Sequence, residues 1–168
     1  MKEHKKYDTI ILVILMITIL IATFTIALNI INAKADAQTV KCWVICQPGD
    51  YVNAREAPST RSEVVGRLDG GDPIWITGKT KNGFAQIDAS FEVSTAWVYS
   101  GYIVFDEPKY LGGEQYTIRS NGRVAARKRI NGDRRAWLVD GSTVKVYWWS
   151  AEWCVTDKGF VKTEFIGK

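Results

Sequence analysis

The apolar residues form one long run near the start of the chain and short alternating runs after it. Residues 9–33 carry no charge, and residues 10–31 are mostly Ile, Leu, Val and Ala. A helix of that length spans roughly 33 Å, close to the hydrocarbon thickness of a bilayer. Lys2, Lys5 and Lys6 precede the run and predict that the N-terminus stays in the cytoplasm. The pattern therefore predicts one membrane helix over residues 10–31, with the rest of the chain beyond it.

A cleaved signal peptide is the alternative interpretation of this segment. Ala33-Lys34-Ala35 and Ala35-Asp36-Ala37 both fit a small-residue cleavage site, although the apolar part of a signal peptide usually spans only about 7–15 residues. Without cleavage the protein is membrane-anchored, and with cleavage near Ala37 it is secreted. Both interpretations place the C-terminal part outside the cytoplasm.

Short runs in which apolar and polar residues alternate fill the remainder of the chain, and a period of two is typical of β-strands. The predicted strands of the first half are residues 39–46, 52–55, 64–68 and 73–77. Asn82-Gly83 predicts a hairpin turn between two such runs. Residues 106–113 contain one Pro and two Gly and are predicted to form a linker.

One unit of this pattern occurs twice. Val52-x-Ala54-Arg55 returns as Val124-x-Ala126-Arg127, and the spacing from Trp97 to Ile103 equals that from Phe160 to Ile166. An internal repeat fixes the organisation of a chain before its details are known. The predicted parts are an N-terminal segment over residues 1–37, a first β-unit over 38–107 and a second, basic β-unit over 108–168.

Each copy carries an arm, an apolar run ending in Leu, an aromatic residue and a closing aromatic motif. These are residues 52–59, 64–68, Phe84 and 96–103 in the first copy, and residues 123–127, 136–138, Trp153 and 159–166 in the second. The pattern resembles the bacterial SH3 (SH3b) family over residues 51–103 and 122–166. Two positions depart from the family pattern: Glu56 replaces a small residue, and the second arm, residues 128–132, lacks the usual proline.

The resemblance implies an all-β protein of two tandem small SH3-like antiparallel barrels, with about five strands each, behind one N-terminal transmembrane or signal helix. Members of the family are found on secreted or surface proteins, often beside cell-wall hydrolases. Many are thought to bind peptidoglycan. The resemblance thus implies a binding module outside the cytoplasm.

Charge is divided unevenly between the two units. Residues 38–114 contain seven bases and ten acids, whereas residues 115–168 contain eleven bases and five acids, a net charge of +6. An excess of basic side chains favours an anionic partner. A solvated basic face without a partner would give the same composition.

Aromatic rings beside basic side chains are the candidate ligand-binding residues, because rings pack on sugars or peptides and arginines pair with phosphates and carboxylates. The candidates are Arg55, Phe84, Arg127, Lys128, Arg129, Arg134, Arg135, Trp148, Trp149 and Trp153. Trp97, Trp137 and Phe160 are instead predicted to fill the core. Trp148 and Trp149 are neighbours on a predicted strand and point to opposite faces, so at most one of them can be core.

The cysteines and the single histidine limit the chemistry of the folded part. His4 precedes the apolar run, so no histidine is available for a catalytic triad or a zinc site after residue 37. Cys42 and Cys46 lie too far apart on one strand to bridge each other. A bridge from Cys46, or from Cys42, to Cys154 is one expectation in an oxidising compartment, and three free buried thiols are the other. The sequence predicts no enzyme, no cofactor and no metal site.

Two classes of function remain open at this point. One is a non-catalytic module that binds cell-wall peptidoglycan or teichoic acid, held to the membrane through residues 10–31. The other is a membrane-anchored structural component that docks onto protein partners in a surface complex. Nucleic-acid binding by the basic second unit is the weakest alternative, because the N-terminal segment predicts export.

Overall fold

The computed structural model describes Met16, residues 39–88 and residues 95–168. Apart from Met16, the predicted membrane helix over residues 10–31 lies outside the described residues, as does the cleavage site near Ala37. Within the part of the chain that is described, no helix is both long and apolar enough to span a bilayer. Residues 39–168 form one compact unit. Its secondary structure is almost entirely β, as the sequence predicts.

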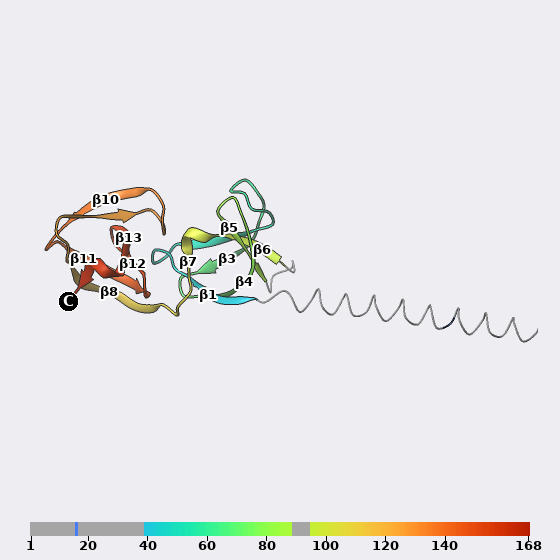
Figure 1. Ribbon diagram of the computed structural model, residues 1–168, viewed down its shortest axis with the longest axis horizontal. Coiled ribbons are helices and arrows are strands. Elements are labelled where there is room, and N and C mark those ends of the chain that lie inside the picture. Colours follow the sequence, from blue (N-terminus) through green and yellow to red (C-terminus); the bar gives the residue numbers. More distant parts are fainter. Residues whose placement is uncertain (1–15, 17–38, 89–94) are drawn as a thin grey trace, which may run out of the picture. The chain divides into compact units, whose positions relative to one another are not determined.

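The first half of this unit is a seven-stranded antiparallel sheet, here called the first barrel (Figure 1). Its strands are β1 (Val40–Val44), β2 (Tyr51–Arg55), β3 (Val64–Asp69), β4 (Pro73–Lys81), β5 (Phe84–Asp88), β6 (Thr95–Tyr99) and β7 (Ile103–Val104), and the 3-10 turn η1 (Ser100–Tyr102) precedes β7. The spatial order is β3-β2-β6-β5-β4-β1-β7. Asn82 and Gly83 join β4 to β5, which confirms the predicted hairpin.

The second half is another seven-stranded antiparallel sheet, the second barrel (Figure 1). Its strands are β8 (Lys109–Ile118), β9 (Arg123–Arg127), β10 (Arg134–Val139), β11 (Thr143–Trp149), β12 (Trp153–Thr156), β13 (Gly159–Lys162) and β14 (Ile166–Gly167), with η2 (Thr163–Phe165) before β14. The spatial order β10-β9-β13-β12-β11-β8-β14 repeats that of the first sheet strand for strand. The repeated unit therefore includes β1 and β8, which the sequence repeat does not reveal.

Strand β8 replaces most of the predicted linker. The prediction of a linker over residues 106–113 is wrong beyond Pro108, because the backbone from Lys109 onward pairs with β11, and its end pairs with β14. Gly112 and Gly113, which suggested a linker, have φ of 63° and 88° and lie opposite the irregularity in β11 between Val146 and Trp148. The glycines thus mark a local distortion within a strand.

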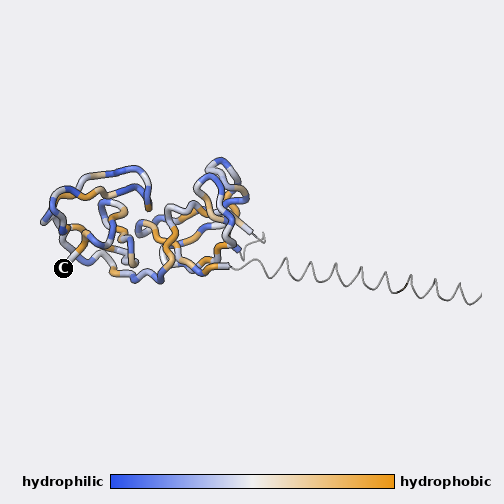
Figure 2. The backbone as a smooth tube through the Cα atoms, in the orientation of Figure 1, coloured by the Kyte–Doolittle hydropathy of each residue, from blue (hydrophilic) through white to orange (hydrophobic). Residues whose placement is uncertain are grey.

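Each barrel has its own apolar core, built from alternate residues of its strands. Val52 and Ala54 of β2 are buried, as are Val124 and Ala126 at the matching positions of β9. Figure 2 shows hydrophobic stretches along the strands and hydrophilic ones at the connections. Units of about 60 residues are marginally stable alone. Each barrel therefore gains stability from any apolar surface that it buries outside its own core.

A third apolar cluster lies where the barrels meet. Ile45 and Val104 of the first barrel pack with Trp153, Val155 and Phe160 of the second, and all five are buried. Full burial of one such side chain contributes roughly 1.5–3 kcal/mol. This cluster joins the two barrels into a single unit and fixes the groove described below.

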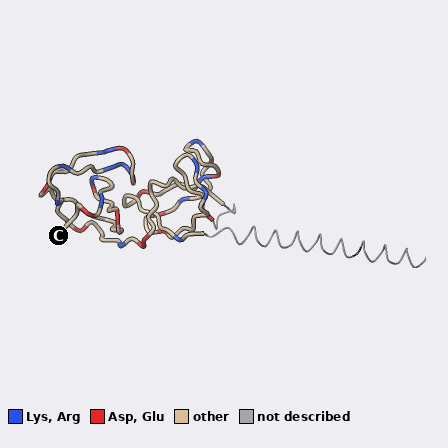
Figure 3. The backbone as a smooth tube through the Cα atoms, in the orientation of Figure 1, with Lys and Arg blue, Asp and Glu red and all other residues tan. Residues whose placement is uncertain are grey.

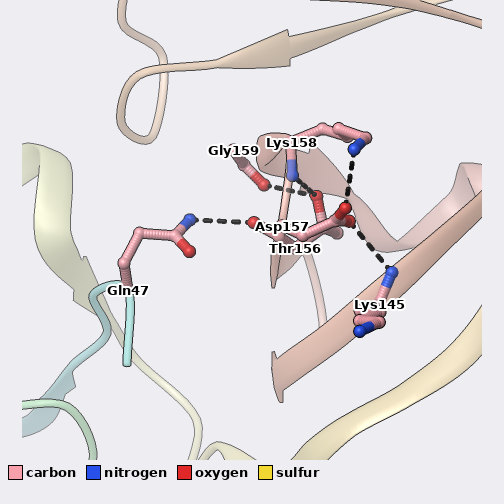
Figure 4. Close-up of polar contacts among 6 residues, drawn as sticks. All are labelled: Gln47, Lys145, Thr156, Asp157, Lys158 and Gly159. Atoms are coloured by element: carbon pink, nitrogen blue, oxygen red, sulfur yellow. Dashed lines mark hydrogen bonds and ion pairs between the residues drawn. The ribbon is translucent and has the colours of Figure 1, made fainter. Parts of the chain in front are cut away.

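Hydrogen bonds cross the same junction. The Gln47 side-chain amide donates to the Thr156 carbonyl oxygen at 2.8 Å (Figure 4). The Thr156 hydroxyl donates to the Gly159 carbonyl oxygen at 2.8 Å, which holds the β12–β13 turn. Burial alone would raise the pKa of Asp157, but hydrogen bonds from the Lys158 ammonium and the Lys145 backbone N–H lower it overall. The turn that presents the Thr156 carbonyl is therefore itself well supported.

The cysteines are free in this structure. Cys42 and Cys46 lie in the core of the first barrel, whereas Cys154 lies in the core of the second. The Cys46–Cys154 bridge expected from the sequence is absent, because Cys46, which follows β1, and Cys154 of β12 belong to separate cores. The alternative expectation of three buried free thiols describes what is found.

Candidate binding grooves

A groove of about 420 Å³ lies at the junction of the two barrels. We call it the composite groove, because both barrels contribute to it. The first barrel contributes Cys46, Gln47, Asp50, Tyr51, Val52, Asn53, Arg55, Thr60, Phe84, Tyr99 and Tyr102, and the second contributes Lys128, Arg129, Arg135 and Phe160. Half of the ten predicted ligand-binding residues are therefore brought together here from distant parts of the sequence.

A row of aromatic rings runs along the composite groove from one barrel to the other. The ring centroids of Phe84 and Tyr99 lie 5.1 Å apart, those of Tyr99 and Tyr102 6.4 Å, and those of Tyr102 and Phe160 5.9 Å. All three pairs meet edge to face, an arrangement that stabilises aromatic clusters. Phe84 and Phe160 are almost fully buried, whereas the two tyrosines are half-buried and line the groove.

The second arm supplies a cation above this row. The Arg129 guanidinium carbon lies 4.9 Å from the centre of the Tyr99 ring, within the range of a cation–π contact. The Ile130 N–H donates to the Gly101 carbonyl oxygen at 2.9 Å and fixes the arm on η1. A Cβ on Gly101 would lie 2.9 Å from both Arg129 Cδ and Tyr99 Cε1. Glycine at position 101 therefore leaves the room that the arm needs to approach η1.

Basic side chains predominate around the composite groove. Lys128, Arg129 and Arg135 make no ion pair with any carboxylate in the described parts of the chain. Asp50 is the one acidic residue among the lining residues named above. Burial is the main cause that raises the pKa of the Tyr102 phenol, so this hydroxyl stays neutral and able to donate. The groove can therefore accept an anionic or hydrogen-bonding ligand.

Arg55 and Arg127 occupy equivalent positions and have equivalent structural tasks. Arg55 Nη1 donates to the Ser62 carbonyl oxygen at 2.6 Å, and Arg127 Nη1 donates to the Gly132 carbonyl oxygen at 2.8 Å. Each arginine thereby closes the arm of its own barrel. Only the guanidinium N–H groups that these bonds do not use are therefore available for the predicted role in ligand binding.

A second groove, of about 400 Å³, lies on the second barrel alone. We call it the distal groove. Its lining residues are Arg123, Val124, Ala125, Arg127, Asn131, Trp137, Trp153, Lys162, Glu164 and Phe165. Most of them occupy positions equivalent to those lining the composite groove: Arg123 matches Tyr51, Arg127 matches Arg55, and Trp153 matches Phe84.

Trp137 is exposed at the rim of the distal groove, with 48% of its surface accessible. The prediction that it fills the core is wrong, because Leu138 takes the inward position on β10 and its neighbour must face outward. The prediction is confirmed for Phe160, which is 2% exposed, and Trp97 is half-buried. The Arg134 guanidinium stacks 4.5 Å from the centre of the Trp137 ring.

The other predicted tryptophans have mainly structural surroundings. Trp153 is 4% exposed and packs in the cluster between the barrels, although it also lines the distal groove. Trp149 packs on Tyr116 against the second core. Trp148 points the other way and lies against Tyr110 and the Gly70-Gly71 turn, where a Cβ on either glycine would come within 2.8 Å of the indole. Trp148 is half-buried because the Gly70-Gly71 turn of the first barrel lies against it, and Trp149 is half-buried against the second core.

Sequence reasoning missed several residues of the grooves. Tyr51, Tyr99 and Tyr102 line the composite groove, while Arg123 and Lys162 line the distal one. The repeat itself could have identified Arg123, because it occupies the position of Tyr51 beside the arm. Figure 3 shows Lys and Arg positions along β9 and β10, the strands that carry Arg123, Arg134 and Arg135.

Comparisons with known proteins identify one part of the chain. Residues 50–104 match the family model described as "Bacterial SH3 domain". No curated protein matches the chain. The sequence resemblance is thereby confirmed for the first copy.

Two solved structures are similar to the chain. NlpC1 from Trichomonas vaginalis is 10% identical with a TM-score of 0.35, and the match covers 79% of this chain and 46% of that one. NlpC2 from Trichomonas vaginalis is 11% identical with a TM-score of 0.32, covering 79% of this chain and 49% of that one. The chain spans about half the length of these two structures.

Proposed function

We propose that residues 39–168 form a non-catalytic module that binds cell-wall peptidoglycan in the composite groove. In this proposal the second barrel is a second bacterial SH3 domain. The N-terminal segment either anchors the module in the membrane or is removed near Ala37, so that the module acts outside the cytoplasm. The bacterial SH3 domain at residues 50–104 and the repeated strand order support this assignment.

The observation that carries the proposal is the convergence of an aromatic row and unpaired cations in one groove. Peptidoglycan offers sugar rings with apolar faces and short peptides with carboxylates. Half-buried Tyr99 and Tyr102 can pack against the apolar parts. Arg129, already held over Tyr99, can direct its guanidinium donors to a carboxylate.

The thiols give no support for an alternative catalytic role. Burial is the leading cause that raises the pKa of Cys46, in the lining of the composite groove, to about 11. A thiol with that pKa is almost entirely protonated near neutral pH and is a poor nucleophile. The described residues also contain no histidine that could activate it.

The test is co-sedimentation of the full-length chain, in mild detergent, with sacculi whose phosphodiester polymers have been removed by hydrofluoric acid. We expect the wild type to be retained at low salt and released as salt increases. Arg129→Ala should weaken retention roughly tenfold, because it removes a charge-assisted contact at the centre of the groove. Lys145→Ala is the matched control, since Lys145 is exposed on the same barrel and lines neither groove.

Absence of retention at low salt would refute the proposal. If a protein partner co-purified with the chain while sacculi retained nothing, the alternative of a structural component in a surface complex would take its place. Equal losses in Arg129→Ala and Lys145→Ala would mean that binding follows net charge and does not use the composite groove.

A further inference from the structure

The distal groove is the counterpart of the composite groove, but its described lining contains no residue of the first barrel. In the first barrel, the equivalent surface is completed by Lys128, Arg129 and Arg135. Among the described residues, all those that line the distal groove belong to the second barrel, and the exposed Trp137 borders it. It is thus a separate surface with its own chemistry.

Two arginines are held on the Trp137 ring. The guanidinium carbon of Arg134 lies 4.5 Å from the ring centre and that of Arg123 lies 5.5 Å from it. A guanidinium stacked on an aromatic face keeps its in-plane N–H donors free, and those donors match the oxygens of phosphate groups. The ring therefore pre-positions two donor groups beside the groove.

Most of the positive charges at this groove have no acidic partner within the described residues. Neither Arg123 nor Arg134 makes an ion pair with a carboxylate in the described ranges. Lys162, which also lines the groove, lies 3.6 Å from the Glu164 carboxylate. Arg127 adds a further positive charge and uses one donor within its arm. A multiply charged anion complements this arrangement better than a neutral sugar does.

We infer that the distal groove binds a chain of repeating phosphodiesters, the anionic polyol-phosphate polymer of the cell wall. Successive phosphates along such a chain can meet Arg123, Arg134 and Lys162. A nucleic acid fits less well, because a base stacking on Trp137 would compete with the two guanidinium groups that lie over its ring. The inference rests on the proposed wall-binding function for the source of the polymer but concerns a different groove.

The test uses the full-length chain and compares sacculi before and after hydrofluoric acid treatment, together with soluble poly(glycerol phosphate). The wild type should bind untreated sacculi more tightly than treated ones and should bind the soluble polymer. Arg123→Gln/Arg134→Gln should weaken polymer binding roughly tenfold or more and leave binding to treated sacculi unchanged. Arg61→Gln/Lys145→Gln is the matched control, because it removes the same charge from exposed positions outside both grooves.

The outcomes separate this inference from the proposed function. Binding to treated sacculi with no gain from the polymer would overturn the inference and leave the composite groove as the wall-binding site. Equal losses in the two double variants would also overturn it, because the attraction would then be general. A single-stranded oligonucleotide that bound more tightly than poly(glycerol phosphate) would assign the groove to nucleic acid instead. Thermal unfolding midpoints of both variants within a few degrees of the wild type exclude a folding defect.

Discussion

An aromatic ring and an arginine border each groove, but the two residue types have exchanged strands. In the first barrel Arg67 on β3 lies 4.3 Å from the centre of the Tyr51 ring on β2. In the second barrel the β9 residue is Arg123 and the β10 residue is Trp137, 5.5 Å apart. The repeat thus keeps the contact and changes which strand supplies each partner. Position-by-position comparison of the two copies cannot detect such a pair.

The three thiols show how a residue's surroundings decide its chemistry. Burial is the leading cause that raises the pKa values of Cys42, Cys46 and Cys154 from 9.0 to about 11. The folded state therefore favours the neutral thiol more strongly than the unfolded state does. Each thiol contributes stability that is fully present below pH 9 and is lost as the pH rises toward about 11.

We predict that the free energy of unfolding decreases between pH 9 and pH 10.5, by about 1.5 kcal/mol for each buried thiol. Urea unfolding of the wild type and of Cys154→Ala at pH 7, 9 and 10.5 measures this contribution. The variant should show the smaller decrease, because one titrating thiol is missing while all other groups are common to both proteins. Identical pH profiles would show that the buried thiol is not responsible.

At the scale of elements, the second arm is the segment that makes two barrels into one site. Its backbone reaches η1 of the first barrel through Ile130, and its Arg129 lies over Tyr99. The Ile130 side chain packs against the cluster between the barrels. The loss of the family's proline in residues 128–132 goes together with this docking, because the Ile130 N–H is used as a donor across the junction.

We predict that Ile130→Ala lowers the free energy of unfolding by about 1–2 kcal/mol, since it removes partly buried apolar surface between the barrels. It should also weaken binding to treated sacculi, because the arm that positions Arg129 loses a contact. Urea unfolding and co-sedimentation measure the two effects. Val139→Ala, at a 55% exposed position of the same barrel, should change stability by less than about 0.5 kcal/mol. If Ile130→Ala lowered the stability but bound treated sacculi as the wild type does, the arm would not be required for binding.

Alternation and turn residues were sufficient to predict β1 to β4. Residues 52–55 and 64–68 fall in β2 and β3, and Asn82-Gly83 makes the predicted hairpin. The same local signals failed over residues 106–113, because the pairing of β8 with β11 outweighs the preference of its glycines for turns. The individual contacts between the barrels could not be predicted either, because the sequence does not show that Phe160 and Tyr102 lie close together.

For the molecule as a whole, the basic residues that are concentrated in residues 115–168 of the sequence gather at the two grooves. Seven of the eleven bases in residues 115–168 line or flank the two grooves. Arg134 and Arg135 are neighbours on β10, yet Arg134 stacks at the distal groove and Arg135 lines the composite one. The acidic first barrel therefore obtains a basic groove wall from the second barrel. The proposed binding therefore uses both barrels, and the apolar cluster between them adds to their stability.

The central claim is that peptidoglycan occupies the composite groove, and protection of individual arginines from phenylglyoxal tests it most directly. The full-length chain is modified with and without saturating soluble peptidoglycan fragments, and each arginine is followed by mass spectrometry. We predict that the fragments slow modification of Arg129 and Arg135 while leaving Arg61, Arg123 and Arg134 unchanged. Modification of Arg129 and Arg135 at the same rate with and without bound fragments would contradict the account.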